Sequence, residues 1–252
     1  MNYTKIEGKI NENKSVDFGD ILNKSFELFK KTWQQGLLHM LLSIGVVLGV
    51  MAIIMIPLFM MGLFDMSSFE SLESGAPDFS GIILLYLAMF PAIFVAAVFS
   101  MLLNAAFYRI IKQIDLEEEV AVLPTFGMFF KSEYIMKAFV LSLLTMVIAI
   151  LAMIACYLPL FYVMIPLTFV VVIFAYNPEM STSDIIKLSF KLGTKKWLVT
   201  FGLVIVASIL AEVVGLLLCG IGIFATASFV YLPTYYIYKE VIGFDASKTD
   251  DI

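Results

Sequence analysis

The sequence predicts an all-α fold: a polytopic transmembrane helical bundle of six spans in three hairpins, with amphipathic interfacial helices and a partial parallel internal repeat. Three observations lead to this prediction. The 252 residues are 61% hydrophobic and only 15% charged, which is too little polar surface for a protein that faces water on all sides. Several long stretches contain no Asp, Glu, Lys or Arg. One fourteen-residue segment occurs twice, each time directly before such a stretch.

The repeated segment reads DILNKSFELFKKTW at 20–33 and DIIKLSFKLGTKKW at 184–197. Seven of the fourteen aligned positions are identical: Asp20/Asp184, Ile21/Ile185, Ser25/Ser189, Phe26/Phe190, Leu28/Leu192, Lys31/Lys195 and Trp33/Trp197. Asp17 and Ser181 stand at helix N-cap positions, and an acidic residue follows in each first turn. We therefore expect each copy to be an amphipathic helix on the membrane surface. A helix packed on a soluble core is the alternative.

Each copy carries residue types that suit a membrane interface. Trp33 and Trp197 end the two copies, and such aromatic rings anchor helices at the level of the lipid headgroups. Lys187, Lys191 and Lys195 recur at four-residue steps along one side of the second copy. We expect these five residues to contact lipid, the lysines near anionic headgroups.

Two charge-free runs predict the first hairpin. Residues 32–64 and 79–108 each exceed the roughly 20 apolar residues that a span requires. Pro57 and Pro91 should kink these two helices. The loop between the runs, 65–80, holds four acidic residues and no basic one.

Longer runs predict the other two hairpins. Residues 138–178 carry no charge, and one helix of that length would measure about 60 Å, twice the hydrocarbon thickness. The run must therefore fold back, with 156–159 as the expected turn. Residues 197–238 repeat the pattern with a turn at 219–222 and Glu212 as their only charge. Cys156 and Cys219 fall at these turns, either as a disulfide or as small packing residues.

The basic residues determine the predicted orientation. All 16 lysines and arginines lie before the first span, between the second and third, between the fourth and fifth, or after the sixth. The positive-inside rule then places both termini in the cytoplasm, with the spans in the bacterial cytoplasmic (inner) membrane. We expect a mobile cytoplasmic tail at 1–16, one membrane domain at 17–244 and a C-terminal tail at 245–252. The net charge of −5 does not favour a nucleic-acid partner.

Two polar residues inside the spans are candidates for a functional role. Glu212 is the lone ionisable group deep in an apolar run, where a carboxylate costs about 2.5–3.5 kcal/mol; it either serves an ion path or packs against a neighbouring helix. Asn104 is expected to join helices by hydrogen bonding rather than to hold a ligand. His39, the only histidine, has no clustered Cys, Asp or Glu nearby, so we expect no metal site and no cofactor.

Three features carry a resemblance over nearly the whole chain: the segment DILNKSFELFKKTW before a span, Leu158-Pro159 with Ile165-Pro166, and DIIKLSFKLGTKKW before the last hairpin. They resemble bacterial six-helix membrane proteins related to the membrane domain of glycerophosphodiester phosphodiesterases. In the fused relatives a separate soluble domain performs the hydrolysis, and the resemblance does not extend to such a domain. It therefore implies a role in the membrane without the phosphodiesterase activity.

Three functions compete at this point. We expect a non-catalytic integral membrane protein that binds lipid or a partner protein at the cytoplasmic membrane, because the surface helices are the best-marked feature. A small transporter or channel that uses Glu212 is the first alternative. A membrane enzyme is the second, and it is disfavoured because the sequence contains no metal-ligand cluster, phosphate loop or serine paired with an activating histidine.

Overall fold

The structure is a computed structural model that describes residues 1–61, 79–155, 158–218, 220 and 222–244. Helices make up nearly all of this part of the chain, and no strand occurs in it. In chain order the elements are α1 (Tyr3–Glu12), α2 (Phe18–Met60), α4 (Phe79–Asp115), α5 (Val122–Met128), α6 (Ser132–Ile154), α7 (Leu158–Tyr176), α8 (Thr182–Lys195), α9 (Trp197–Leu217), α10 (Ile223–Thr226), the 3-10 helix η1 (Ala227–Val230) and α11 (Tyr231–Val241). The predicted all-α class is confirmed.

Five of the described helices are long and apolar enough to cross a membrane: α2, the 86–115 part of α4, α6, α7 and α9. The chain therefore has the character of a membrane-embedded protein. Helix α6 ends at Ile154 and α7 begins at Leu158, so the run at 138–178 is interrupted where its turn was predicted. Helix α9 ends at Leu217, also at the predicted break.

The predicted sixth span is not one long helix. The segment 223–241 consists of α10, η1 and α11 in succession, and none of the three reaches span length. Its junctions at Ala227 and Tyr231 keep right-handed helical backbone angles, so the direction of the chain is maintained through the 3-10 turn. All three pieces pack along α9.

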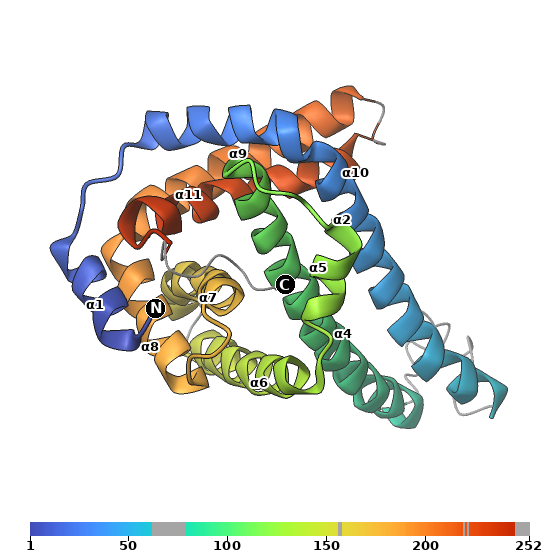
Figure 1. The fold of residues 1–252 in the computed structure, drawn as a ribbon. Coiled ribbons are helices and arrows are strands. Elements are labelled where there is room, and N and C mark those ends of the chain that lie inside the picture. Colours follow the sequence, from blue (N-terminus) through green and yellow to red (C-terminus); the bar gives the residue numbers. More distant parts are fainter. Residues whose placement is uncertain (62–78, 156–157, 219, 221, 245–252) are drawn as a thin grey trace.

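Helix α2 contains both the first repeat copy and the first predicted span. It begins at the predicted cap, where the Asp17 side chain accepts a hydrogen bond from the Asp20 backbone N–H at 2.8 Å. Figure 1 shows the helix changing direction part of the way along, between its first portion over α9 and α11 and the portion that runs beside α4. Pro57 lies inside the helix near its end.

The second copy forms α8, and its N-cap is again the predicted one: the Asp184 N–H donates to Ser181 Oγ at 3.1 Å. In both copies the repeated Ile, Ser and Leu are buried, so these identities mark helix-packing positions. Gly193 replaces Phe29 of the first copy. A Cβ at Gly193 would lie 2.5 Å from Pro166 Cα, so only glycine permits α8 to pack so closely on α7.

The first sixteen residues, predicted to be a mobile tail, contain the helix α1. Asn2 caps it by accepting from the Lys5 N–H at 3.1 Å, and Ile6 and Ile10 are completely buried. Both isoleucines belong to the same hydrophobic cluster as the buried residues of α4, α7 and α11. Figure 1 shows α1 against α8 at one edge of the molecule.

Candidate functional site

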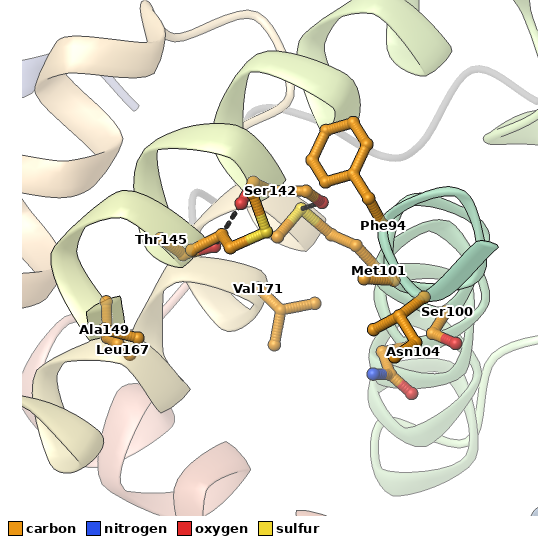
Figure 2. A pocket seen from close by; sticks show the side chains of 12 residues that line it. Phe94, Ser100, Met101, Asn104, Ser142, Thr145, Ala149, Leu167 and Val171 are labelled. Carbon is orange, nitrogen blue, oxygen red and sulfur yellow. Dashed lines mark hydrogen bonds between the residues drawn. The ribbon is translucent and has the colours of Figure 1, made fainter. Parts of the chain in front are cut away.

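A cavity of about 480 Å³ lies between α4, α6 and α7, all of which have the length and composition of membrane spans. Twelve side chains line it, and eight of them are apolar (Figure 2). Its polar residues are Ser100 and Asn104 of α4 and Ser142 and Thr145 of α6. Ligand pockets are typically about 300–1,000 Å³ and mainly apolar with a few placed polar groups, so size and lining both fit a ligand site.

Asn104 joins three helices at the end of this cavity. Its Oδ1 lies 2.9 Å from His39 Nε2 of α2 and accepts a hydrogen bond from the Tyr231 hydroxyl of α11 at 3.1 Å. Asn104 therefore connects α4 to α2 and α11 by hydrogen bonds. Asn104 is also a lining residue, so it belongs to the wall of the cavity as well as to the helix contact.

Aromatic rings hold His39 in place. The imidazole stacks on Phe107 with 4.6 Å between ring centroids and meets Tyr231 edge-on at 5.3 Å. Only 2% of His39 is exposed. Within the described residues no group of His, Cys, Asp and Glu could hold a metal ion, and His39 serves here as a hydrogen-bond and stacking partner of Asn104 and Phe107.

The lysine row of α8 meets the N-terminal helix rather than open surface. Lys191 donates to Glu7 Oε1 at 2.7 Å, and Lys195 donates to the Ile10 carbonyl oxygen at 3.1 Å. The Lys191 ammonium lowers the pKa of the Glu7 carboxyl. Lys187 is exposed and has no hydrogen bond or ion pair with any residue that the structure describes. Of the three lysines predicted to contact headgroups, Lys187 alone keeps its charge away from α1.

The neighbouring Lys196 extends these contacts to the linker after α1. It is 7% exposed and donates to Asn13 Oδ1 at 2.9 Å and to the Lys14 carbonyl oxygen at 2.6 Å. Burial lowers the pKa of Lys196, and the adjacent Lys195 charge adds to this effect. The N-terminal segment is thus held by three lysines at the end of the second repeat copy.

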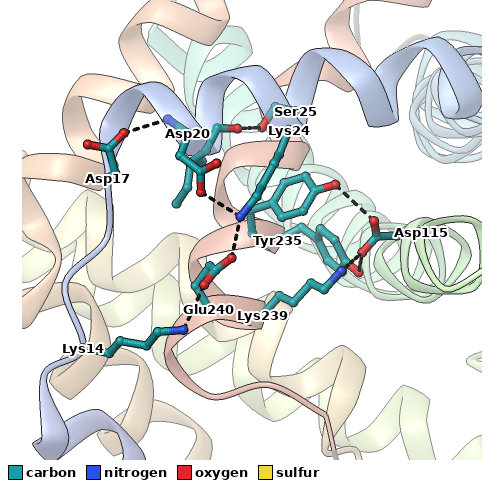
Figure 3. Close-up of polar contacts among 11 residues, drawn as sticks. Lys14, Asp17, Asp20, Lys24, Ser25, Asp115, Tyr235, Lys239 and Glu240 are labelled. Carbon is teal, nitrogen blue, oxygen red and sulfur yellow. Dashed lines mark hydrogen bonds and ion pairs between the residues drawn. The ribbon is translucent and has the colours of Figure 1, made fainter.

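A second polar cluster joins the ends of α2, α4 and α11 (Figure 3). Asp115 ends α4, and its carboxylate accepts hydrogen bonds from the Tyr235 hydroxyl at 2.5 Å and the Tyr236 hydroxyl at 3.1 Å, and pairs with Lys239. Glu240, the residue after Lys239, pairs with Lys24 of α2 at 2.8 Å and with Lys14 at 3.0 Å. These two lysines, Lys24 first, lower the pKa of the Glu240 carboxyl.

The sequence did not identify Asp115 or its partners as a cluster. Asp115 lies between the second and third predicted spans, and the tyrosines of α11 lie near the end of the last charge-free run. The signal available was a carboxylate at the C-terminal end of a helix, which the helix dipole disfavours unless donors compensate it. Nothing in the sequence placed α11 beside that end, so the donors could not be named.

Glu212 lies apart from the cavity. Its side chain is exposed on α9, next to Val213, which is 49% exposed, and it is not a lining residue. Glu212 has no hydrogen bond or ion pair with the described part of the chain.

The two tryptophans differ in their surroundings. Trp197 begins α9, donates through Nε1 to the Tyr162 carbonyl oxygen at 3.0 Å and stacks on Phe201. Trp33 of α2 remains 42% exposed. Cys156, Cys219 and the acidic loop up to residue 78 lie outside the described residues.

The structure brings one predicted candidate, Asn104, into a cavity and two others, Lys191 and Lys195, onto α1. It leaves Glu212, Lys187 and Trp33 exposed on three different helices. Compared with known protein families, curated proteins and solved structures, the chain matches none.

Proposed function

We propose that this chain is a non-catalytic, multi-pass membrane protein that binds a membrane lipid in the cavity between α4, α6 and α7. The cavity carries the proposal: it is about 480 Å³, mainly apolar, and formed by three helices of span character. Ile93 on its wall is 54% exposed, so the cavity opens onto the apolar surface of the bundle. In a membrane this surface is covered by lipid, so a lipid chain is the most readily available ligand.

The six-span topology with both termini in the cytoplasm of a bacterial inner membrane forms part of the same proposal, with α10, η1 and α11 acting together as the sixth span. Contacts between polar segments support it. Lys24 precedes the first span and pairs with Glu240 after the last, while Arg109 at the end of α4 donates to the Ala175 carbonyl oxygen at the end of α7 at 2.8 Å. Segments predicted to share one side of the membrane thus touch one another.

The proposal places lipid binding inside the bundle rather than along the lysines of α8. Lys191 and Lys195 already contact α1, which leaves Lys187 with the exposed Trp33 for headgroup contacts. Glu212 supplies no comparable support for transport, because it does not line the cavity.

Filling the cavity tests the proposal. Ala97 lines it from α4, and Ala97→Phe should remove the space for a chain. The matched control is Ala52→Phe, which places the same ring on an exposed alanine of α2 outside the cavity. Lipid retained by the purified proteins is measured by native mass spectrometry. We expect the wild type and Ala52→Phe to retain a lipid that Ala97→Phe loses; equal retention in all three would refute binding in this cavity.

A further inference from the structure

The two ends of the Asn104 amide have different surroundings. Its oxygen is engaged twice, by His39 Nε2 at 2.9 Å and by the Tyr231 hydroxyl at 3.1 Å. Its Nδ2 group has no hydrogen bond to any described residue and lies on the cavity side (Figure 2). In this orientation of the amide, Asn104 presents its N–H groups to the cavity and directs its acceptor oxygen toward His39 and Tyr231.

Two of the three hydroxyl groups in the cavity wall, those of Ser142 and Thr145, already donate their hydrogen to protein atoms. Ser142 Oγ donates to Met101 Sδ at 3.7 Å, and Thr145 Oγ1 donates to the Ser142 carbonyl oxygen at 3.0 Å. Lys, Arg, Asp and Glu are all missing from the described lining. An ionised ligand group would therefore lie without a counter-charge in an apolar site, which is strongly unfavourable, so the part of the ligand inside the cavity is neutral.

The position of Asn104 along α4 also bears on the ligand. It precedes Arg109 by five residues, which corresponds to about 7–8 Å along a helix. The donor thus sits just below the polar end of the span rather than at the bilayer centre. A lipid carries its ester carbonyl groups between the headgroup and the acyl chain, so a chain that fills the cavity brings a carbonyl to this depth.

We infer that the cavity selects a neutral lipid that bears a carbonyl oxygen, such as an acyl glycerol, and that this oxygen accepts a hydrogen bond from Asn104 Nδ2. The inference rests on the proposed lipid-binding function and names its ligand class. His39 and Tyr231 act as positioning residues, because they hold the oxygen end of the amide and leave the nitrogen end for the ligand.

A pair of lipids that differ only in the carbonyl tests this. The probes are 1-oleoylglycerol, an ester, and its 1-O-oleyl ether, which has the same chain and headgroup. Each is titrated into delipidated protein, and the bound fraction is measured by native mass spectrometry. A net hydrogen bond corresponds to about three- to tenfold tighter binding of the ester in the wild type. Asn104→Leu should bind ester and ether equally.

The outcomes separate the two proposals. If neither lipid binds the wild type, lipid binding in the cavity is wrong and the ligand class falls with it. If both bind equally well, the function stands and the carbonyl preference is overturned. A preference that persists in Asn104→Leu would assign the donor to another residue. Should Asn104→Leu fail to fold, the comparison of the two lipids on the wild type still decides whether a carbonyl is selected.

Discussion

Gly193 shows how the absence of a single Cβ atom permits a close contact between two helices. It stands where the first repeat copy has Phe29, and its missing side chain lets α8 lie against the backbone of Pro166. Gly193→Ala would place Cβ 2.5 Å from Pro166 Cα, and overpacking of this kind costs about 1–3 kcal/mol, more than the gain in helix propensity.

Gly45 provides the control, because a Cβ there would meet nothing within 4 Å. Gly45→Ala should leave thermal stability in detergent unchanged or raise it by up to about 1 kcal/mol, as helix propensity alone predicts. Gly193→Ala should lower the unfolding temperature. Identical stability of the two variants would show that α7 and α8 separate without strain at this position.

At the residue scale the sequence predicted what depends on neighbours in the chain. The caps Asp17 and Ser181 follow from local hydrogen-bonding rules, and both are confirmed. Asn104 was expected to join helices, but its partners come from α2 and α11, which no local rule brings together. The Asp115 cluster was missed for the same reason.

The contact between α1 and α8 is the feature of element scale that the sequence missed. Lys191→Gln combined with Lys195→Gln removes two charged donors from this contact and should speed hydrogen exchange of the α1 backbone amides. Ile6 and Ile10 stay buried, so we expect loosening of α1 rather than complete release. Mass spectrometry of peptides from 3–12 measures the effect.

Lys187→Gln is the matched control, since Lys187 lies on the same helix and has no hydrogen bond or ion pair with the described part of the chain. It should leave exchange in α1 unchanged. Loss of protection in this variant as well would mean that the summed charge of α8, and not the individual contacts, retains α1.

Acidification should loosen the same contact. Lys191 lowers the pKa of Glu7 below its ordinary value of 4.5, so the folded protein holds this carboxyl ionised more strongly than the unfolded chain does. The resulting stabilisation is present above that ordinary value and is lost as pH falls through the lowered pKa. Protection of the α1 backbone amides from hydrogen exchange should therefore decline below about pH 4.5. In the Glu7→Gln variant these amides should be equally weakly protected at all pH values.

The elements themselves were predicted unevenly. Long charge-free runs correctly indicated the five span-like helices of the described residues, because hydrophobic length is a property of the sequence alone. The sixth predicted span is instead a succession of three short helices. Helix α1 was missed, although Ile6 and Ile10 have the four-residue spacing of one helical face, since a polar segment gains its helix by packing on α8. The 3-10 turn η1 was not foreseen either. Ser228 in it lies against Gly36 of α2, a contact made only in the folded bundle.

At the scale of the whole molecule, the orientation in the membrane remains a prediction with a direct test. In a variant whose two cysteines are replaced by serine, a cysteine at Ser132 should be shielded from an impermeant thiol reagent applied outside cells. One at Ser71, which lies outside the described residues, should react. The opposite pattern of labelling would place the basic segments outside the cell.

The all-α fold class was predictable because composition and charge spacing constrain it strongly. The arrangement of the helices was not predictable, because a hydrophobic run indicates a helix suited to lipid without specifying which neighbouring helix it contacts. The cavity illustrates this limit. Ile93, Ala97 and Thr145 are ordinary residues of apolar helices, and only the packing of α4, α6 and α7 brings them together as the wall of a cavity.

The bond between Glu7 and Lys191 has a consequence for the order of assembly. The two residues are 184 positions apart, so at about 5–20 residues per second the ribosome needs roughly 10–40 s after α1 emerges before its partner exists. During that interval the Glu7 carboxylate lacks this lysine, and Lys14 and Lys24 lack Glu240, which is made later still. In the predicted topology, this is the period in which basic charge directs the insertion of spans. Docking of α1 is then among the last steps of biogenesis, and a chain interrupted before residue 191 would expose α1 to proteases of the compartment in which it resides.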